Sequence, residues 1–461
     1  MTDYAALLRP DRGEPARVIH LVRPEEWDGW RAAQPPRART AAAAHGLTGR
    51  PGDKAILPGD GAEDWSALLV CDEPASSPWR FASMGAFLPP GTYRLAAGEP
   101  GPAALGWLLG QYRFDRYRKG DGGEPRVLLT PDPAGAAEAV RLAEATALVR
   151  DLVNTPASDM GPAELEATAE ALGKRHGAQL TITRGDALSQ GYPMIHAVGL
   201  AAAKERHPRL IELDWGDPAH PRVALVGKGV CFDTGGLDIK PSAGMKLMKK
   251  DMGGAAHALA LAGLVMAARL PVRLHLLIPT VENSVGPAAF RPSDVLRTRA
   301  GLAVENTNTD AEGRLILADA LTKAVEGKPE VILNYATLTG AARVALGPDL
   351  PPLFANDDAL ADALLAAGTA QGDPLWRMPL WDAYDADLKS DIADLQNAPE
   401  GGMAGAITAA LFLRRFVPKE IAWAHMDVFA WRPAARPGRP KGGDAFGLRA
   451  AWAVLKERYR R

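Results

Sequence analysis

The stretch Val223-Ala224-Leu225-Val226-Gly227-Lys228-Gly229 is the best guide to the fold class of this chain. Four apolar residues, typical of a buried strand, lead into a glycine-rich turn, and a helical pattern follows at residues 254–268. Further along, residues 272–278 and 331–333 have strand character, and residues 313–325 have helical character. This alternation predicts an α/β fold with a largely parallel sheet and helices on its faces.

The N-terminal part of the chain has a different composition. It is rich in Pro, Gly and Arg and shows only short strand-like pieces, such as residues 18–22. Turn-forming residues gather in Arg118–Gly135, and a helical pattern then runs over residues 136–153. We therefore predict a divergent N-terminal α/β domain over residues 1–135. A larger domain over residues 136–461 would begin with the helix as a linker.

The overall composition excludes several classes of protein. The 461 residues include 53 Lys and Arg and 55 Asp and Glu, and 47% are hydrophobic, as in soluble globular proteins. The near-neutral charge balance argues against a nucleic-acid binder or a membrane-surface protein. Cys71 and Cys231 cannot build a disulfide framework, and no apolar run resembles a signal peptide. We therefore expect a soluble cytoplasmic protein.

Ionisable residues gather in two segments, Val226–Asp251 and Asn306–Arg314, which follow or flank predicted strands. Ligands of open α/β sheets bind beyond the carboxyl ends of the strands, so these segments are candidate sites. The charged residues near apolar segments are Lys228, Asp233, Lys240, Asp251, Asp310, Glu312 and Arg314. Burying four carboxylates together is costly without strong cations, and two divalent ions would neutralise them. Solvated loops and ion-pair networks are the alternative, and this pattern alone leaves both open.

Motifs of several other chemistries are absent. The chain has no HExxH or HxxEH zinc motif, no GxxxxGK[ST] phosphate loop and no GxSxG nucleophile turn. Gly227-Lys228-Gly229 fails as a dinucleotide fingerprint because Phe232 stands where the third glycine belongs. Apolar neighbours favour a buried structural role for Cys231, and we interpret His425 as a structural histidine.

Three motifs resemble those of the leucyl aminopeptidases, also called cytosol aminopeptidases. Residues Asn308–Leu315 match the family's signature octapeptide, and Gly227–Lys240 matches its metal-binding loop, with Asp251 at the family spacing. Residues Ala336–Gly340 match its substrate-side loop. The resemblance covers about residues 105–455, whereas the first hundred residues match poorly.

The resemblance implies a fold and an activity. The fold would be a smaller N-terminal α/β domain, macro-like, followed by a larger C-terminal α/β/α catalytic domain with a mainly parallel central sheet. The activity would be removal of the N-terminal amino acid from peptide substrates through a metal-bridged water. Two divalent metal ions per subunit, Mn²⁺ or Zn²⁺, are implied as cofactors, together with bicarbonate. A homohexamer is implied as the assembly, and neither membrane nor nucleic-acid partners are expected.

Residue roles are implied in the same way. The metal ligands would be Lys228, Asp233, Asp251, Asp310 and Glu312. Lys240 would act as electrophile, and Arg314 would hold a bicarbonate that serves as general base. The resemblance adds Gly313 and Leu338 to the bicarbonate site. Substrate contacts would come from Met248, Asn308, Thr337 and Gly340.

One position departs from the family pattern. Phe429 stands two residues after Asp427, where the family usually has a small residue. We therefore expect a reshaped side-chain pocket, which leaves the preferred N-terminal residue open. The alternative to catalysis is a nucleic-acid-binding or regulatory role on the same fold. Its candidate contacts would be Arg414-Arg415 and Arg432–Arg439, although a solvated surface is the simpler interpretation of these arginines.

Overall fold

The computed structural model describes residues 2–61, 64–118 and 124–460. They form two compact units, Met1–Ala147 with Ala434–Lys441, and Leu148–Pro433 with Gly442–Arg461. The predicted boundary segment Arg118–Gly135 includes residues 119–123, which lie outside the described residues. The domain limits at residues 135 and 136 therefore stay a prediction.

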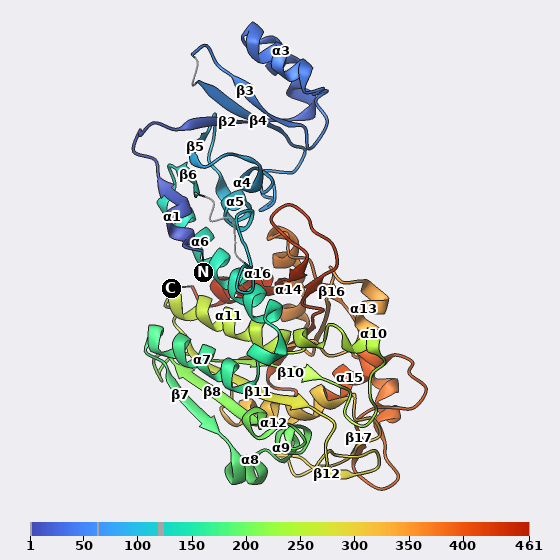
Figure 1. Cartoon of the computed structure of the whole chain (residues 1–461). Coiled ribbons are helices and arrows are strands. Elements are labelled where there is room, and N and C mark those ends of the chain that lie inside the picture. Colours follow the sequence, from blue (N-terminus) through green and yellow to red (C-terminus); the bar gives the residue numbers. More distant parts are fainter. Residues whose placement is uncertain (1, 62–63, 119–123, 461) are drawn as a thin grey trace. The chain divides into compact units, whose positions relative to one another are not determined.

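The first unit contains a mostly parallel sheet, drawn in blue and cyan in Figure 1. Its strands, in spatial order, are β1 (Leu8–Pro10), β6 (Arg126–Thr130), β5 (Gly91–Leu95), β2 (Arg17–Val22), β4 (Trp65–Val70) and β3 (Lys54–Pro58). Only β3 pairs antiparallel to its neighbour. The helices are α1 (Tyr4–Leu7), α2 (Trp27–Ala32), α3 (Pro36–Ala44), α4 (Met84–Phe87) and α5 (Ala104–Leu109). Trp27 packs with Ala42 and Leu68 in a small core that joins α2 and α3 to the sheet.

The second unit is built on a larger mixed sheet. The spatial order of its strands is β16 (Trp376–Arg377), β15 (Pro352–Ala355), β18 (Ala422–Asp427), β14 (Val331–Ala336), β9 (Arg222–Gly227), β11 (Arg273–Asn283), β8 (Arg209–Trp215) and β7 (Gln179–Thr183). Strand β10 (Gly229–Asp233) also pairs with β11. The central strands β18, β14, β9 and β11 are parallel, and β15, β8 and β7 are antiparallel to a neighbour. The carboxyl ends of the central strands therefore meet at one edge.

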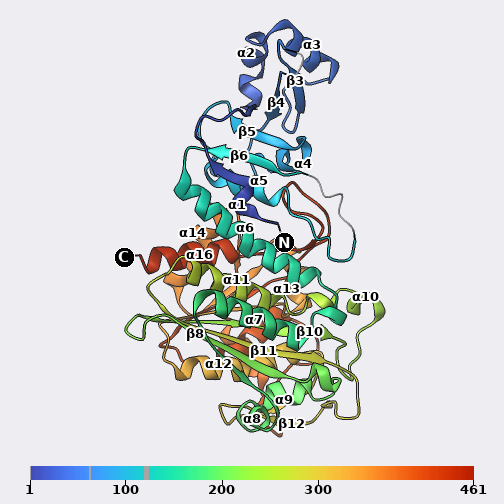
Figure 2. The ribbon, with the colours of Figure 1, turned by 60° about the vertical axis from the view of Figure 1, so that its left-hand side comes forward.

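Helices cover both faces of this sheet. In Figures 1 and 2, α7 (Pro162–His176) and α11 (Gly253–Ala267) lie on one side of β11, and α9 (Pro193–Gly199) and α12 (Glu312–Glu326) lie on the other. The remaining helices are α6 (Pro133–Asn154), which runs from the first unit into the second, and α8 (Gly185–Gly191), α10 (Ser242–Met245), α13 (Gly340–Leu346), α14 (Asp358–Ala370), α15 (Gly405–Arg414) and α16 (Leu448–Arg458). Short strands β12 (Val295–Arg297), β13 (Ala303–Glu305) and β17 (Leu395–Gln396) form a separate sheet, and β19 (Trp431–Arg432) pairs with β20 (Gly442–Gly443).

Small residues let α11 lie directly against the sheet. Nearly all of its side chains are buried. A Cβ atom at Gly254 would stand 2.3 Å from the carbonyl oxygen of Tyr335 in β14, so only glycine fits there. This close approach fixes the start of α11 at the carboxyl edge of the central strands, where ligands bind in such sheets.

The expected fold is confirmed: an N-terminal α/β unit precedes a larger α/β unit whose central strands are parallel. The predicted helices at residues 254–268 and 313–325 appear as α11 and α12, and the predicted strand at residues 272–278 corresponds to the first part of β11, which begins one residue later at Arg273. Among the described residues, no helix is both long enough and apolar enough to cross a membrane.

Candidate metal centre and substrate cavity

Lys228 stands at the break between β9 and β10, and its backbone is fixed from two sides. Its N–H donates to the carbonyl of Tyr335 at 3.0 Å, and its own carbonyl accepts from the N–H of Ala255 at 2.8 Å. The side chain runs past Gly313, where a Cβ atom would lie 2.6 Å from the Lys228 Cε. Glycine at position 313 therefore makes room for a buried lysine beside the start of α12.

Four carboxylates reach the same place from different elements. Asp233 ends β10, Asp251 precedes α11, Asp310 lies in the loop before α12, and Glu312 begins α12. Asp233, Asp251 and Glu312 are each at most 3% exposed, so the charges are held away from water. The sheet edge thus gathers the residues that the sequence motifs placed in separate segments.

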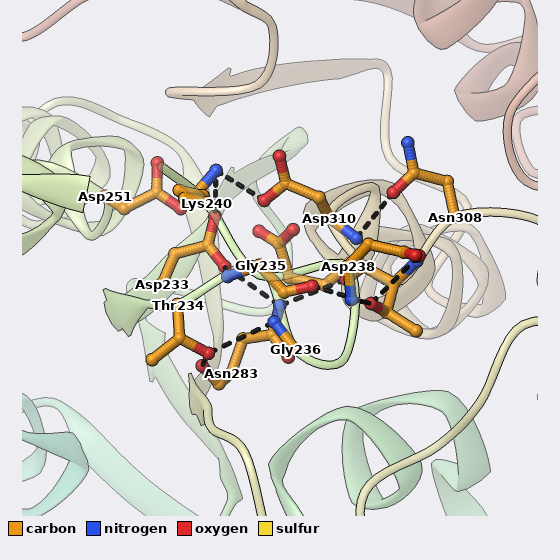
Figure 3. A network of polar contacts seen from close by, with 12 residues as sticks. Asp233, Thr234, Gly235, Gly236, Asp238, Lys240, Asp251, Asn283, Asn308 and Asp310 are labelled. Atoms are coloured by element: carbon orange, nitrogen blue, oxygen red, sulfur yellow. Dashed lines mark hydrogen bonds and ion pairs between the residues drawn. The ribbon is translucent and has the colours of Figure 1, made fainter. Parts of the chain in front are cut away.

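Two lysines pair with these four carboxylates. Lys228 Nζ lies 2.7 Å from Asp251 Oδ2 and 2.9 Å from Glu312 Oε1. Lys240 Nζ lies 2.8 Å from Asp233 Oδ2 and also contacts Asp310, as Figure 3 shows. The lysines therefore leave an excess of buried negative charge in the cluster.

Several oxygens of the cluster are suited to bind a cation. Asp251 Oδ2, Asp310 Oδ1 and Glu312 Oε1 are buried, and each contacts the ammonium group of Lys228 or Lys240. One oxygen each from Asp233, Asp310 and Glu312 lies within 4.8 Å of the others. Converging carboxylate oxygens are the ligands that hard and borderline divalent ions take.

The ionisation of the cluster follows from burial and crowding. Burial, together with the charge of Asp233, raises the pKa of Glu312, and the same two causes raise the pKa of Asp310. Burial acts to lower the pKa of Lys228, but Asp251 and Glu312 outweigh it and raise that pKa above its usual value. Without further cations, the cluster therefore favours the protonated form of Glu312 and a charged Lys228.

Thr337 holds two members of the cluster. Its hydroxyl donates to Asp251 Oδ1 at 2.8 Å, and its carbonyl accepts from Lys228 Nζ at 3.0 Å. Asn283, at the end of β11, donates from Nδ2 to Asp233 Oδ1 at 2.8 Å. Asn283 was not predicted from the sequence, although its place at a strand's carboxyl end is the signal that would have found it.

Asp427 was likewise not assigned a role from the sequence. It ends β18, is buried, and accepts hydrogen bonds from the N–H of Leu338 at 2.8 Å and the hydroxyl of Thr339 at 2.6 Å. Burial raises the pKa of Asp427 to about 6. These bonds fix the substrate-side loop Ala336–Gly340 against β18.

A cavity of about 310 Å³ opens beside the charged cluster. The predicted residues that line it are Lys228, Asp233, Lys240, Met248, Asp251, Asp310, Glu312, Thr337, Leu338 and Gly340. Asp427, Phe429, Lys250 and Arg343 line it as well. Asn308 is not part of the lining; its side-chain oxygen accepts from the N–H of Asp310 at 2.8 Å and shapes the loop instead.

Arg314 and Gly313 also lie outside the cavity lining. Arg314 is buried on α12, and its Nη1 donates to the carbonyl of Asn397 at 2.5 Å. No described residue forms a hydrogen bond with its Nε, and burial lowers the pKa of its guanidinium to about 10. A buried donor without an acceptor suits an anion, so the position remains compatible with the predicted bicarbonate contact.

The other residues considered from the sequence have structural surroundings. His425 is buried between the rings of Phe354 and Trp423, and burial lowers its pKa to about 3. Cys231 is buried, and its Sγ lies 3.4 Å from the hydroxyl of Thr280. Neither side chain lines the cavity.

Three of the arginines considered for a nucleic-acid interface take part in ion pairs within the chain. Arg414 pairs with Asp382 at 2.6 Å, and Arg415 pairs with Asp385. Arg432 pairs with Asp349 at 2.6 Å. These contacts account for Arg414, Arg415 and Arg432 without a nucleic acid, so they give the alternative function no support.

Comparison with known proteins places this geometry in a family. Residues 147–451 match the profile of the cytosol aminopeptidase family, catalytic domain, and residues 18–130 match that of the M17 aminopeptidase N-terminal domain. A probable cytosol aminopeptidase of Geobacter sp. (strain M21) is 42% identical over 395 residues, which cover 82% of this chain and 79% of that protein. The likeness thus extends into the N-terminal region that the motifs did not reach.

Comparison with solved structures gives the same family. The cytosol aminopeptidase of Coxiella burnetii is 45% identical, with a TM-score of 0.93 over 98% of this chain and 100% of that chain. The bottromycin maturation enzyme BotP, solved in complex with Mn, is 32% identical, with a TM-score of 0.87 over 97% of this chain and 100% of that one. A non-catalytic role finds no support among these relatives. The chain belongs to the cytosol aminopeptidase family and is an aminopeptidase.

Proposed function

We propose that this chain is a di-metal aminopeptidase that removes the N-terminal residue of peptides. The excess of buried carboxylates over lysines at the cavity carries the proposal. Such a cluster is costly in a folded protein unless cations bind it. The related enzyme BotP was solved in complex with Mn, which supports a divalent ion such as Mn²⁺ or Zn²⁺ here.

The ligands would be Lys228, Asp233, Asp251, Asp310 and Glu312, with Asp233 and Glu312 bridging the two ions. Lys228 would have to bind as a neutral amine. Its ammonium group lies between Asp251 and Glu312, and nearby divalent charge would lower its pKa and release the proton. Bound ions would supply the charge that polarises the scissile carbonyl and lowers the pKa of a bridging water.

Lys240 and Arg314 would act on charge that develops during the reaction. Lys240 lines the cavity, and Asp233 and Asp310 offset the lowering of its pKa by burial, so it stays charged. It is placed to donate to the oxyanion of a tetrahedral intermediate. Arg314, with Gly313 and Leu338, would hold a bicarbonate as general base, and the unpaired Nε of Arg314 supports this assignment.

Substrate binding would use the cavity wall. Met248, Thr337 and Gly340 line it, and a Cβ atom at Gly340 would meet nothing within 4 Å, so this stretch of backbone is open to a peptide. Asn308 would contribute by shaping the Asp310 loop. A free α-amine bound at the metal site would restrict cleavage to the N-terminal residue.

Assembly and location complete the proposal. The family relationship supports a homohexamer, which light scattering at micromolar concentration would show as about six subunits. The relatives are named cytosol aminopeptidases, and both cysteines are buried and free, which together support a cytoplasmic location.

Chelation tests the proposed activity. The protein would be dialysed against a strong chelator, its metal content measured, and hydrolysis of aminoacyl p-nitroanilides followed before and after addition of Mn²⁺ or Zn²⁺. We expect activity to vanish with the metal and to return with about two ions per subunit. Full activity in a verified metal-free sample would contradict the proposal.

A further inference from the structure

Lys250 is a buried lysine in the cavity wall, and no carboxylate of the described residues forms an ion pair with it. Its side chain lines the cavity, and the residue is 5% exposed. Among the described residues its ammonium group has no hydrogen-bond or ion-pair partner, and it faces the ring of Phe429, 4.7 Å from Nζ to the ring centroid. Lysines are seldom buried without a close acceptor for the ammonium group, so the place of Lys250 in the cavity wall needs an explanation.

The neighbouring lysines show how unusual this is. Lys228 and Lys240 each pair with two carboxylates of the cluster. Lys249, the preceding residue, donates to the carbonyl of Asn154 at 2.5 Å and is not part of the cavity lining. Asp427 also lines the cavity, but it already accepts from Leu338 and Thr339. Among the described residues, Lys250 therefore differs from these neighbouring lysines because it lines the cavity without a close acceptor.

A second cation faces the same ring. The guanidinium carbon of Arg343, an exposed residue on α13, lies 5.4 Å from the Phe429 ring centroid, and Arg343 also lines the cavity. Ala430, which follows Phe429, is fully buried in a left-handed conformation with φ of 56°. Non-glycine residues rarely adopt this conformation, and it persists only where packing imposes it. The backbone thus holds Phe429 where both cations meet it.

We propose that Lys250 and Arg343 make this enzyme selective for peptides whose N-terminal residue carries a carboxylate side chain, glutamate or aspartate. The inference rests on the proposed aminopeptidase function. Phe429 lines the cavity, and the two cations at its ring offer charge-assisted hydrogen bonds to an anionic side chain. An acidic side chain would supply the acceptor that Lys250 lacks.

The position of Lys250 in the chain favours the substrate's N-terminal side chain, rather than its C-terminal carboxylate, as the anion that Lys250 binds. Lys250 directly precedes Asp251, a proposed ligand of the metal site that would bind the substrate's α-amine. The side chain of the N-terminal residue branches from the carbon that bears this amine. The C-terminal carboxylate, even of a dipeptide, lies beyond the scissile bond. Substrates without a C-terminal carboxylate separate the two sources.

The first experiment compares isosteric substrates. The p-nitroanilides of glutamate and glutamine differ in side-chain charge and have no C-terminal carboxylate. We expect kcat/KM for glutamate to exceed that for glutamine by roughly 10-fold or more, as for a hydrogen bond to a charged group. Lys250→Met should abolish or reverse this ratio, and Arg343→Gln should reduce it. Lys249→Met is the matched control and should leave the ratio unchanged.

The ratio is robust to altered folding or metal content, because both substrates are measured on one preparation. Arg343→Gln keeps the test decisive if Lys250→Met does not fold, since Arg343 is exposed. Equal rates for glutamate and glutamine, with leucine p-nitroanilide cleaved well, would overturn the selectivity and leave the aminopeptidase function intact.

Calorimetric titration with free L-glutamate and L-glutamine gives a second readout that does not depend on turnover. We expect the Mn²⁺-loaded protein to bind glutamate roughly 10-fold more tightly, and Lys250→Met to lose this preference. Selective binding of glutamate without hydrolysis of any substrate would support the proposed selectivity of Lys250 and Arg343 for an acidic side chain. It would refute the proposed aminopeptidase function. Neither selective binding nor hydrolysis would overturn both.

Discussion

Two buried charge clusters in the second unit differ in how their charges are balanced. In one, Asp444 lies between Arg150 and Arg432, and Arg432 also pairs with Asp349. Burial acts to raise the pKa of Asp444, but the two arginines outweigh it and lower that pKa. In the cavity cluster, four carboxylates share two lysines, and burial raises the pKa of Glu312 and of Asp310.

The difference separates a structural cluster from a functional one. Rigid guanidinium forks hold Asp444 in its charged form, so that cluster is complete within the chain. The cavity cluster is incomplete until cations arrive, and it opens to a space that a substrate can enter. Charge balance, more than the presence of buried charges, therefore identifies the site.

Glu312→Gln should have the largest effect. It keeps the size of the side chain but removes a charge from the proposed bridging position, so both ions should be lost. Activity should fall by roughly 10³-fold or more, since metal ions supply several kcal/mol of transition-state stabilisation. Metal analysis and kcat/KM are measured together. Glu326→Gln, at the other end of α12, is the control. Two tightly retained ions in Glu312→Gln would refute the bridging assignment.

Lys240→Ala comes next and tests whether the cavity lysine is catalytic or only balances charge. As an oxyanion donor, its loss should lower kcat by roughly 10²–10³-fold, with metal content unchanged. Lys246→Ala, an exposed lysine outside the cavity lining, should be neutral. If metal is lost in proportion to activity, Lys240 balances the charge of the carboxylates and does not stabilise the transition state.

Asp444→Asn tests the cluster in which Asp444 lies between Arg150 and Arg432. It should lower the stability of the protein rather than its activity. The substitution removes the charge that pairs with the buried guanidinium of Arg150 and leaves Arg432 paired with Asp349, at a cost of about 3–5 kcal/mol in the free energy of unfolding. Urea denaturation measures this, and kcat of the folded fraction should stay within a few-fold. Asp382→Asn, which breaks an exposed pair with Arg414, should cost under about 1 kcal/mol. A large loss of kcat in folded Asp444→Asn would contradict the division between the two clusters.

The smallest expected effect is on the free energy of unfolding of the metal-free protein. Its dependence on pH should have opposite signs for the two clusters. The raised pKa of Glu312 means that its contribution to stability is present below the unfolded pKa, near 4.3, and is lost as pH rises through the folded pKa. The lowered pKa of Asp444 gives stability that is present above the unfolded pKa and is lost as pH falls through the folded pKa.

Unfolding free energies across pH measure this dependence. A tenfold difference in proton affinity between the folded and unfolded states contributes roughly 1.4 kcal/mol. Glu312→Gln should flatten the decline on the alkaline side, and Asp444→Asn should flatten the decline on the acid side. Identical pH profiles for the unaltered protein and Glu312→Gln would show that Glu312 has an ordinary pKa in the metal-free state.

Much of the site was visible in the sequence because it lies in continuous motifs. Lys228 and Asp233 follow one strand, and Asp310 and Glu312 flank the start of one helix, so local spacing alone groups them. Their roles as ligands stay predictions, but the structure brings their side chains together at one edge of the sheet.

Other features of the site could not be predicted from the sequence, because they depend on contacts between segments that are distant in the chain. Lys228 and Thr337 are 109 residues apart, and no periodicity links them. The same holds for Asp427, which fixes the substrate-side loop 89 residues earlier. Arg314 lies in the signature motif, yet it is not part of the cavity lining and its Nη1 donates to the carbonyl of Asn397, which sequence spacing cannot reveal.

Local sequence was sufficient to establish the alternation of strands and helices, the close-packed helix α11 and the excess of acidic residues near the strand ends. These features follow from side-chain periodicity, residue size and formal charge, which are local properties. The folded arrangement was needed to establish which charges are compensated. Asp444 meets two arginines, while Lys250 meets the ring of Phe429, because pairing depends on distances between elements that are remote in the chain.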